Sequence, residues 1–170
     1  MTTTTWISTI MTRDLRALRR ELEAYADERD IWRLQPGISN SAGNLALHLA
    51  GNLQYFIGTV LNGTGYVRDR DAEFNRRDVP RAELLRQVDA AIAAVALLSR
   101  ASDADLAKPF PLPVAGVTLA TGEFMIHLAA HFTWHLGQID YHRRLLTGQA
   151  GAIRAVLPTE LASAKPVPKA

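Results

Sequence analysis

The sequence of 170 residues contains no cysteine. This absence excludes disulfide bonds, thiolate metal ligands and cysteine nucleophiles, and it is typical of a protein in a reducing compartment. There is also no run of about 18 apolar residues, the length that a membrane-spanning helix needs. Basic residues begin as early as Arg13, so the N-terminus lacks the apolar core of a secretory signal. We therefore expect a cytoplasmic protein with no membrane partner.

An excess of charge of one sign is missing as well. The sequence has 19 Lys and Arg against 17 Asp and Glu, for a net charge of +2, and acidic residues are interleaved with the arginines. A nucleic-acid-binding protein normally gathers its positive charge on one face. The mixed runs are typical of solvated helix surfaces instead. We expect no nucleic-acid partner.

What the sequence does have is the pattern of four long amphipathic helices. Hydrophobic residues make up 48% of it, and apolar positions recur at spacings of three and four. Helices are expected at about residues 7–28, between residues 39–41 and 62–63, from Pro80 onward, and from Thr121 to just before Gly148. Thr121 is the expected N-cap of the last helix. The sequence therefore predicts an all-α fold, and helices of this length favour a four-helix bundle.

Two connections between these helices are long. Residues 108–116 contain Pro109, Pro111 and Pro113, too many prolines for a helix, and predict an ordered crossover or a short extended segment before the last helix. Residues 64–79 form a connection of the length that tends to be functional or mobile. We expect one domain over residues 1–150 and a partly disordered C-terminal tail over residues 151–170.

Histidines gather on the last predicted helix, which carries four of the five in the sequence. On a helical wheel, His127 and His135 lie within about 40° of His131 and His142 within about 20°, on the apolar stripe. Several imidazoles on one buried stripe leave polar nitrogens to satisfy, and a metal ion satisfies them together. His131 and His135 are one turn apart, a spacing that lets both rings bind one ion.

A third ligand has to come from a facing helix, and the only remaining histidine is His48, on a partly buried face of the second helix. Three histidines from two helices, with one coordination position open, is the composition of a catalytic rather than a structural site. We therefore predict one divalent metal ion bound by His48, His131 and His135.

Polar residues beside these histidines have two readings each. Gln138, on the ligand face, either fixes a water at the ion or fills a packing gap. Asn44 and Asn52, on the face of His48, either orient its ring as outer partners or belong to an internal polar network. Both readings remain open at this point.

Four further residues are candidates for the reaction itself. Asp71 and Glu73 can supply a general base if their loop folds over the site, although charged loops are usually solvated. Tyr55 and His142 either contact a substrate or line the core. All four are expectations from position alone.

Small residues at Ala130, Thr133 and Gly137 form a line along the last helix, away from the histidines. Small side chains let another helix approach closely. That helix can belong to the same chain or to a second copy.

Two segments resemble the signatures of a known superfamily. The segment His127-Leu-Ala-Ala-His131-Phe-Thr-Trp-His135-Leu-Gly-Gln138 resembles the last-helix signature of the DinB/YfiT-like superfamily, in which His-x-x-x-His precedes x-Gly-Gln. The stretch from Ser39 to Asn52 resembles the second-helix signature around the remaining metal-binding histidine. Residues 68–74 are similar to one DinB-related subfamily in particular. The resemblance covers about residues 7–148.

The resemblance implies an up-down-down-up four-helix bundle that binds nickel or zinc through three histidines and is often a homodimer. Carried over position by position, the ligands are His48, His131 and His135. His127 matches a position that is often histidine in relatives without binding the metal. Characterised relatives include transferases and isomerases that use mycothiol, bacillithiol or glutathione, and metal-dependent hydrolases.

Together these features predict a metal-dependent enzyme. A cation held by three neutral imidazoles lowers the pKa of a bound thiol or water. Since the chain has no cysteine, a thiol has to come from a small cosubstrate, and the expected reaction is its transfer to an electrophile. The alternatives are a metal-dependent hydrolase and a non-catalytic, stress-related metal-binding bundle.

Overall fold

We describe the fold from a computed structural model of the chain, which covers residues 1–151, 153 and 156–167. Within these residues it contains six α-helices and no β-strand. The helices are α1 (Thr3–Glu23), α2 (Ala42–Leu53), α3 (Arg70–Asn75), α4 (Arg81–Ala96), α5 (Asp103–Leu106) and α6 (Thr121–Thr147). The all-α prediction is therefore confirmed. None of the helices in this part of the chain is both long and apolar enough to cross a membrane.

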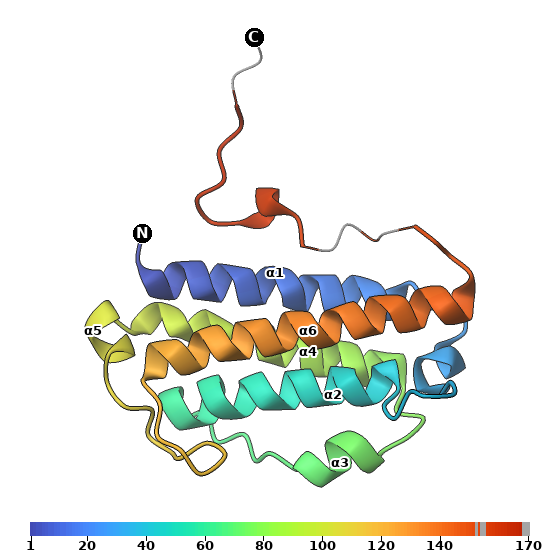
Figure 1. Cartoon of the computed structure of the whole chain (residues 1–170), viewed down its shortest axis with the longest axis horizontal. Coiled ribbons are helices and arrows are strands. Elements are labelled where there is room, and N and C mark those ends of the chain that lie inside the picture. The colour runs from blue at the N-terminus through green and yellow to red at the C-terminus, as the bar shows by residue number, and fades with distance from the viewer. Residues whose placement is uncertain (152, 154–155, 168–170) are drawn as a thin grey trace.

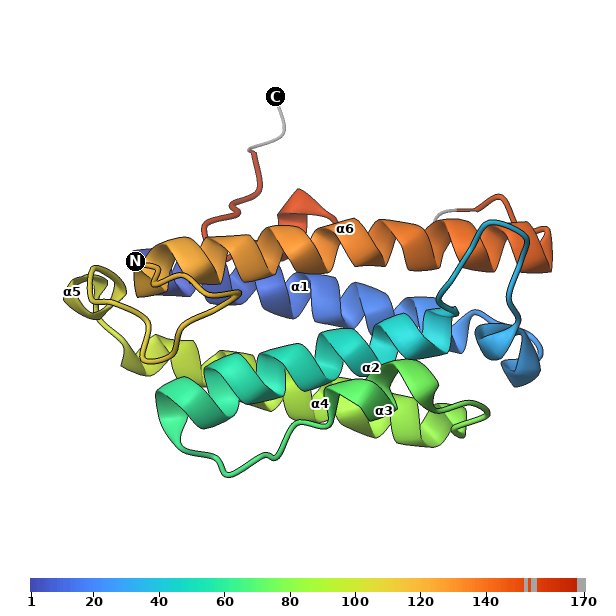
Figure 2. The same cartoon turned by 60° about the horizontal axis from the view of Figure 1, so that its bottom comes forward.

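The four long helices pack lengthwise against one another. Both α1 and α2 pack against α4 and α6, and α2 and α4 run in the direction opposite to α1 and α6 (Figures 1 and 2). Beyond Leu53 the second helix continues as a π-helix, Gln54–Leu61. The second and last helices therefore lie side by side, which places His48 opposite the histidines of α6.

The apolar stripes predicted from the sequence form the core. On α1, Met11, Leu15 and Leu18 are fully buried, and α4 contributes Leu84 and Val88. Each buried side chain of this size stabilises the fold by about 1.5–3 kcal/mol through removal from water. This interior holds α2 and α6 at a fixed separation.

Three helix ends differ from the predicted ends. The Thr2 side chain caps α1, which therefore starts earlier than residue 7. After Glu23 the chain turns, and the Asp27 carboxylate accepts a hydrogen bond from the Arg29 amide to start a separate 3-10 helix, Glu28–Trp32. The N-cap position of α6 is held by Ala120 and not by Thr121.

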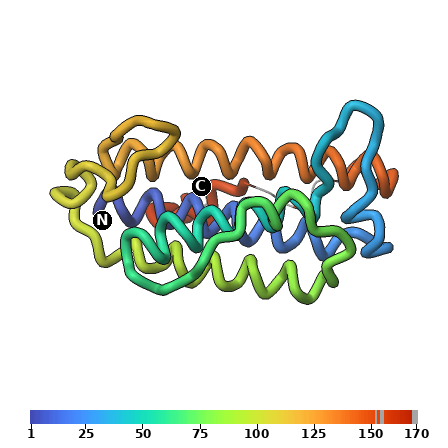
Figure 3. Tube along the Cα trace, turned by 90° about the horizontal axis from the view of Figure 1, so that it is seen from below, coloured from blue at the N-terminus to red at the C-terminus, as the bar shows by residue number. Residues whose placement is uncertain are grey.

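Both long connections contain ordered structure. The Phe110 and Thr121 amides donate to the carbonyls of Leu119 and Lys108, both at 2.8 Å, so the proline-rich segment folds back on itself. Phe110 packs on Phe56 and Phe124 and so covers one end of the helices. The chain from residue 62 to 80 runs along the outside of α2 and contains α3 (Figure 3).

The chain after α6 contacts α1 again. Gly148, with a φ of +66°, ends α6 in the left-handed conformation that glycine adopts without strain. The 3-10 turn Pro158–Glu160 follows, and Glu160 pairs with Arg20 of α1 at 3.4 Å.

Candidate metal centre

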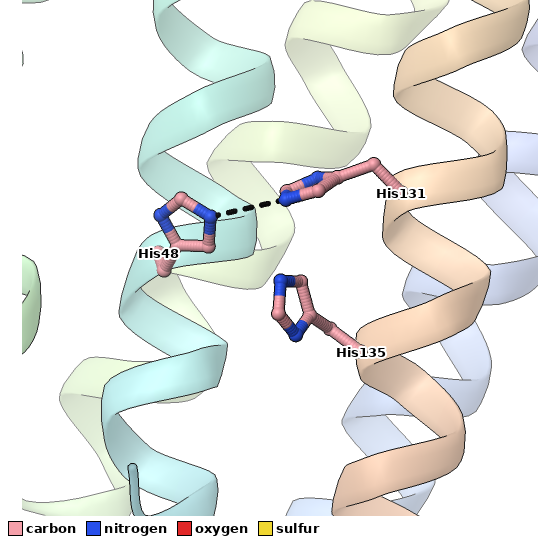
Figure 4. A group of neighbouring side chains, drawn as sticks. All are labelled: His48, His131 and His135. Carbon is pink, nitrogen blue, oxygen red and sulfur yellow. Dashed lines mark hydrogen bonds between the residues drawn. The ribbon is translucent and has the colours of Figure 1, made fainter. Parts of the chain in front are cut away.

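Three imidazoles from two helices converge in the space between α2 and α6. His48 lies on α2, and His131 and His135 lie one turn apart on α6 with their rings directed toward it (Figure 4). The His48 and His131 Nε2 atoms are 3.3 Å apart, and one nitrogen from each ring lies within 4.8 Å of the other two. These three residues could therefore hold one metal ion.

The spacing of the nitrogens fits tetrahedral coordination. An ion with metal–nitrogen bonds of about 2.0–2.1 Å places its ligand nitrogens about 3.3 Å apart. The His48–His131 separation already has this value, and the His135 nitrogen lies within 4.8 Å of both. Among the described residues no other His, Asp or Glu joins this group. Three protein ligands leave a tetrahedral ion with one open position.

The rings on α6 are held in the state that binds metal. The pKa of His131 is lowered to about 4, mainly by burial and also by charge repulsion from the neighbouring His135 and His48 rings. Burial also lowers the pKa of His135, against the opposing effect of a hydrogen bond to Gln138. Both rings are therefore unprotonated at neutral pH and offer a lone pair, as metal binding requires.

A buried carboxylate orients the third ring. Glu73, which is 5% exposed, accepts a hydrogen bond from His48 Nδ1 at 2.9 Å. Because a carboxylate only accepts, the proton of His48 sits on Nδ1 and the lone pair of Nε2 faces α6. Outer carboxylates at metal sites fix the tautomer and the orientation of the ligand in this way.

Arg68 holds Glu73 in its charged form. Its Nε and Nη2 atoms donate to the two carboxylate oxygens at 2.7 and 2.8 Å. Burial acts to raise the pKa of Glu73, but the hydrogen bonds from Arg68 and His48 outweigh it and leave the pKa below its usual value. The carboxylate is therefore engaged on both oxygens.

Three local features bring Glu73 to His48. Asp69 caps α3 by accepting a hydrogen bond from the Ala72 amide. Asn44 of α2 donates to the carbonyls of Glu73 and Arg76, at 3.0 and 3.1 Å. These two bonds hold the C-terminal end of α3 against α2. Gly51 makes room, because a Cβ at this position would overlap the Glu73 carboxylate.

Gln138 has a comparable position beside His135. Its Oε1 atom accepts a hydrogen bond from His135 Nδ1 at 2.7 Å. An amide oxygen only accepts, so the proton of His135 is on Nδ1 and the lone pair of Nε2 is free. Gln138 therefore sets the tautomer of one ring of the cluster, as Glu73 does for another.

A cavity of about 500 Å³ opens beside His135. It is bounded by residues 37–40, by Leu45 of α2, and by His135, Gln138, Tyr141, His142 and Leu145 of α6. Residues 33–41 form the loop beside the C-terminal half of α6 in Figure 3. One histidine of the cluster therefore forms part of the wall of a space large enough for a small molecule.

His142 lines this cavity with both of its nitrogens already bonded. Nε2 donates to the Arg33 carbonyl at 2.8 Å, and Nδ1 therefore accepts from the Tyr25 hydroxyl at 2.6 Å. Burial lowers the pKa of His142, against the opposing effect of that carbonyl, and so favours the neutral ring. His142 can contact a ligand through its ring but has no nitrogen to spare.

The remaining predicted residues lie further from the cluster. Asp71 is exposed in the first turn of α3. Tyr55 packs on Phe56 and is not part of the wall of the cavity beside His135. Asn52 is buried, and its Oδ1 has no hydrogen-bond partner among the described residues.

His127 was expected on the inward-facing stripe of the last helix, but it lies toward the solvent side of α6 and is exposed. Its ring stacks on that of His131, with the two ring centres 6.2 Å apart.

Sequence reasoning did not identify Arg68 and Gly51 as parts of the site. Arg68 lies five residues before Glu73, within one charged segment whose residues look equally solvated in the sequence. Gly51 carries a usable signal, because it is one turn after His48 on the same helix and marks a place where another segment can approach closely.

Comparison with known proteins gives a family for the chain. No match was found among curated proteins. The family described as "Protein of unknown function (DUF1572)" matches residues 3–155. This range includes the three histidines of the cluster and both long connections. The chain therefore belongs to the DUF1572 family, which is part of the DinB/YfiT-like superfamily.

Proposed function

We propose that this protein is a metal-dependent transferase that joins a low-molecular-weight thiol to an electrophile. In this proposal His48, His131 and His135 bind one zinc or nickel ion, and the packing of α1, α2, α4 and α6 is the up-down-down-up bundle of DinB-like proteins. The observation that carries it is the convergence of three imidazoles, one of which, His135, also forms part of the wall of a cavity.

The charges around the cluster support a catalytic rather than a structural ion. When bound, the ion would supply a positive charge that lowers the pKa of a coordinated thiol. The three ligands are neutral rings, and the negative charge of Glu73 is matched by Arg68 at 2.7 Å. The protein therefore leaves most of the charge of the ion for the substrate. A structural ion more often has four protein ligands.

The sulfur atom of the reaction has to come from outside the chain, since the sequence has no cysteine. In the proposed transfer a carbon–sulfur bond forms and the bond from carbon to its leaving group breaks. The thiol proton and the leaving group pass to solvent. Gln138 and Glu73 keep the Nε2 lone pairs of His135 and His48 directed inward throughout.

The test is a transfer assay on protein loaded with zinc or nickel. Glutathione, bacillithiol, mycothiol and cysteine are each offered with an aryl halide, and the thioether is measured. We expect transfer with at least one thiol, its loss on chelation, and its loss in His131→Ala. Thioether formation that is the same after chelation and in His131→Ala would refute the proposal. Metal-dependent ester cleavage without any thiol would establish the hydrolase alternative instead.

We also propose a homodimer through the exposed face of α6. Trp134 and Tyr141 are 71% and 74% exposed on this face, next to Ala130 and Gly137. Large apolar side chains beside small ones suit close packing with a second copy. The Thr133 hydroxyl, by contrast, donates to Asp14 of α1 at 2.7 Å within the chain.

A further inference from the structure

We propose that the cavity beside His135 binds the electrophilic substrate, and that this substrate is an uncharged, mainly apolar molecule with a hydrogen-bond acceptor near its reacting end. The inference rests on the proposed transfer function, because it assigns one of the two reactants to this cavity.

The cavity and the metal cluster share a wall. His135 turns one ring nitrogen toward His48 and His131, while its ring also borders the cavity. A molecule held against Leu45 of α2 and Leu145 of α6 can therefore also contact the His135 ring, which belongs to the cluster. This contact places a bound molecule where a thiol at the open position can reach it.

The charge of the cavity selects against ions. None of the residues that border it is Asp, Glu, Lys or Arg, and both nitrogens of His142 are occupied within the protein. Arg68, the cation beside His48, is bound to both oxygens of Glu73 and is not part of this wall. Apart from the proposed ion, the residues of the wall offer a charged substrate no partner of opposite charge to replace the water that it would lose, which is unfavourable.

One polar group is placed to recognise an acceptor. The Oε1 atom of Gln138 is committed to His135, and its Nε2 atom has no protein partner among the described residues. Two N–H groups are therefore available on a side chain that borders both His135 and the cavity. A carbonyl or nitro oxygen of the substrate would satisfy them and align the neighbouring carbon with the cluster.

The test compares two probes that share a ring system and differ in charge. Naphthalene-2-carboxamide and naphthalene-2-sulfonate are titrated by calorimetry into the zinc-loaded protein, and again after chelation, which removes any direct bond from the sulfonate to zinc. We expect the amide to bind at least tenfold more tightly than the sulfonate in both states. Equal binding, tighter binding of the sulfonate, or no binding of the amide at millimolar concentration would overturn the proposal.

A substitution at Ser39 locates the binding. Ser39 is exposed and borders the cavity from the loop that precedes α2. Ser39→Lys places an ammonium group at the wall, so the sulfonate should bind about tenfold more tightly than it does to the matched variant Ser39→Gln. If sulfonate affinity is the same in both variants, the probes bind elsewhere and the assignment is wrong.

Failure of this inference can be told apart from failure of the proposed function. Selective binding of the amide without any thiol transfer would leave the cavity assignment standing and refute the transferase. Thiol transfer by a protein that prefers the sulfonate would do the reverse.

Discussion

The Glu73 carboxylate lies 2.9 Å from Nδ1 of His48, on the side of the ring that faces away from α6. A six-residue helix in a connecting loop thus controls the orientation of a side chain on α2, whose other nitrogen points toward His131. The candidate site therefore depends on three segments of the chain rather than on the two helices that carry the histidines.

Replacing Glu73 should weaken metal binding without removing a ligand. In Glu73→Gln the charge that holds the His48 ring is lost, and we expect zinc affinity to fall by about 10–100-fold. Competition with a chromophoric chelator measures it. Asp71→Asn, two residues away and exposed, is the matched control and should keep the original affinity. Equal affinities in the two variants would contradict the role of Glu73.

Gly51→Ala should have a similar effect through space alone. The added methyl group would overlap the Glu73 carboxylate and push α3 away from α2. Alanine favours a helix over glycine by about 1 kcal/mol, so lower helix propensity cannot explain a loss. We expect about tenfold weaker zinc binding, measured by the same competition. Unchanged affinity would mean that α3 can shift without disturbing His48.

Removing a proposed ligand should remove the metal. His131→Ala and His135→Ala each leave only two imidazoles, so both variants should retain little of the roughly one ion per chain that we expect. His127→Ala is the control, because this ring is exposed and outside the cluster. Elemental analysis of the purified proteins measures the number of metal ions per chain. Loss of metal in the His127 variant would shift the ligand assignment by one turn of α6.

The metal-free protein should lose stability in mild acid. Burial holds the pKa of His131 near 4 in the folded chain, against 6.5 for an unperturbed ring. Between these pH values the unfolded chain binds a proton that the folded chain does not, so the free energy of unfolding falls as pH decreases from about 6.5 to about 4.

We expect a decrease on the order of 1–3 kcal/mol between pH 7 and pH 4.5 in chelated protein, measured by urea unfolding. His131→Gln cannot take up this proton and should show a smaller decrease. If the free energy of unfolding decreases equally in both proteins, groups other than His131 cause the acid sensitivity.

The oligomeric state can be tested at Gly137. A Cβ atom added there meets nothing within 4 Å in the monomer and Gly137 is exposed, so Gly137→Arg should fold normally. If the exposed face of α6 is the interface, this variant should sediment as a monomer of about the 18.7 kDa chain mass while the parent is a dimer. A parent protein that is monomeric at micromolar concentration would end the dimer proposal.

The sequence predicted the positions of side chains correctly where the periodicity of a single helix determines them. The spacing of His131 and His135 and the stripe of Met11, Leu15 and Leu18 follow from helical periodicity, and the structure has both. Burial of Glu73 does not follow from periodicity. That burial depends on the ion pair with Arg68 and on the space left by the missing side chain of Gly51. Both contacts form only when α3 packs on α2.

The bonds of His142 illustrate the same limit. In the sequence this residue is one more histidine on the apolar stripe of the last helix. Its partners, the Tyr25 hydroxyl and the Arg33 carbonyl, lie more than 100 residues earlier, beyond the end of α1. No local pattern predicts that pairing, and it decides which atoms of His142 are available in the cavity.

His48 and His131 are 83 residues apart in the chain. An ion bound to both would act as a crosslink that closes a loop containing α3, α4 and α5. In the chain-entropy view, a permanent link of this length raises the free energy of unfolding by about 4.5 kcal/mol, and a dissociable ion by less when the unfolded chain also binds it. α1 lies outside the closed loop. With metal bound, hydrogen exchange should therefore slow more at the junction of α2 and α6 than along α1.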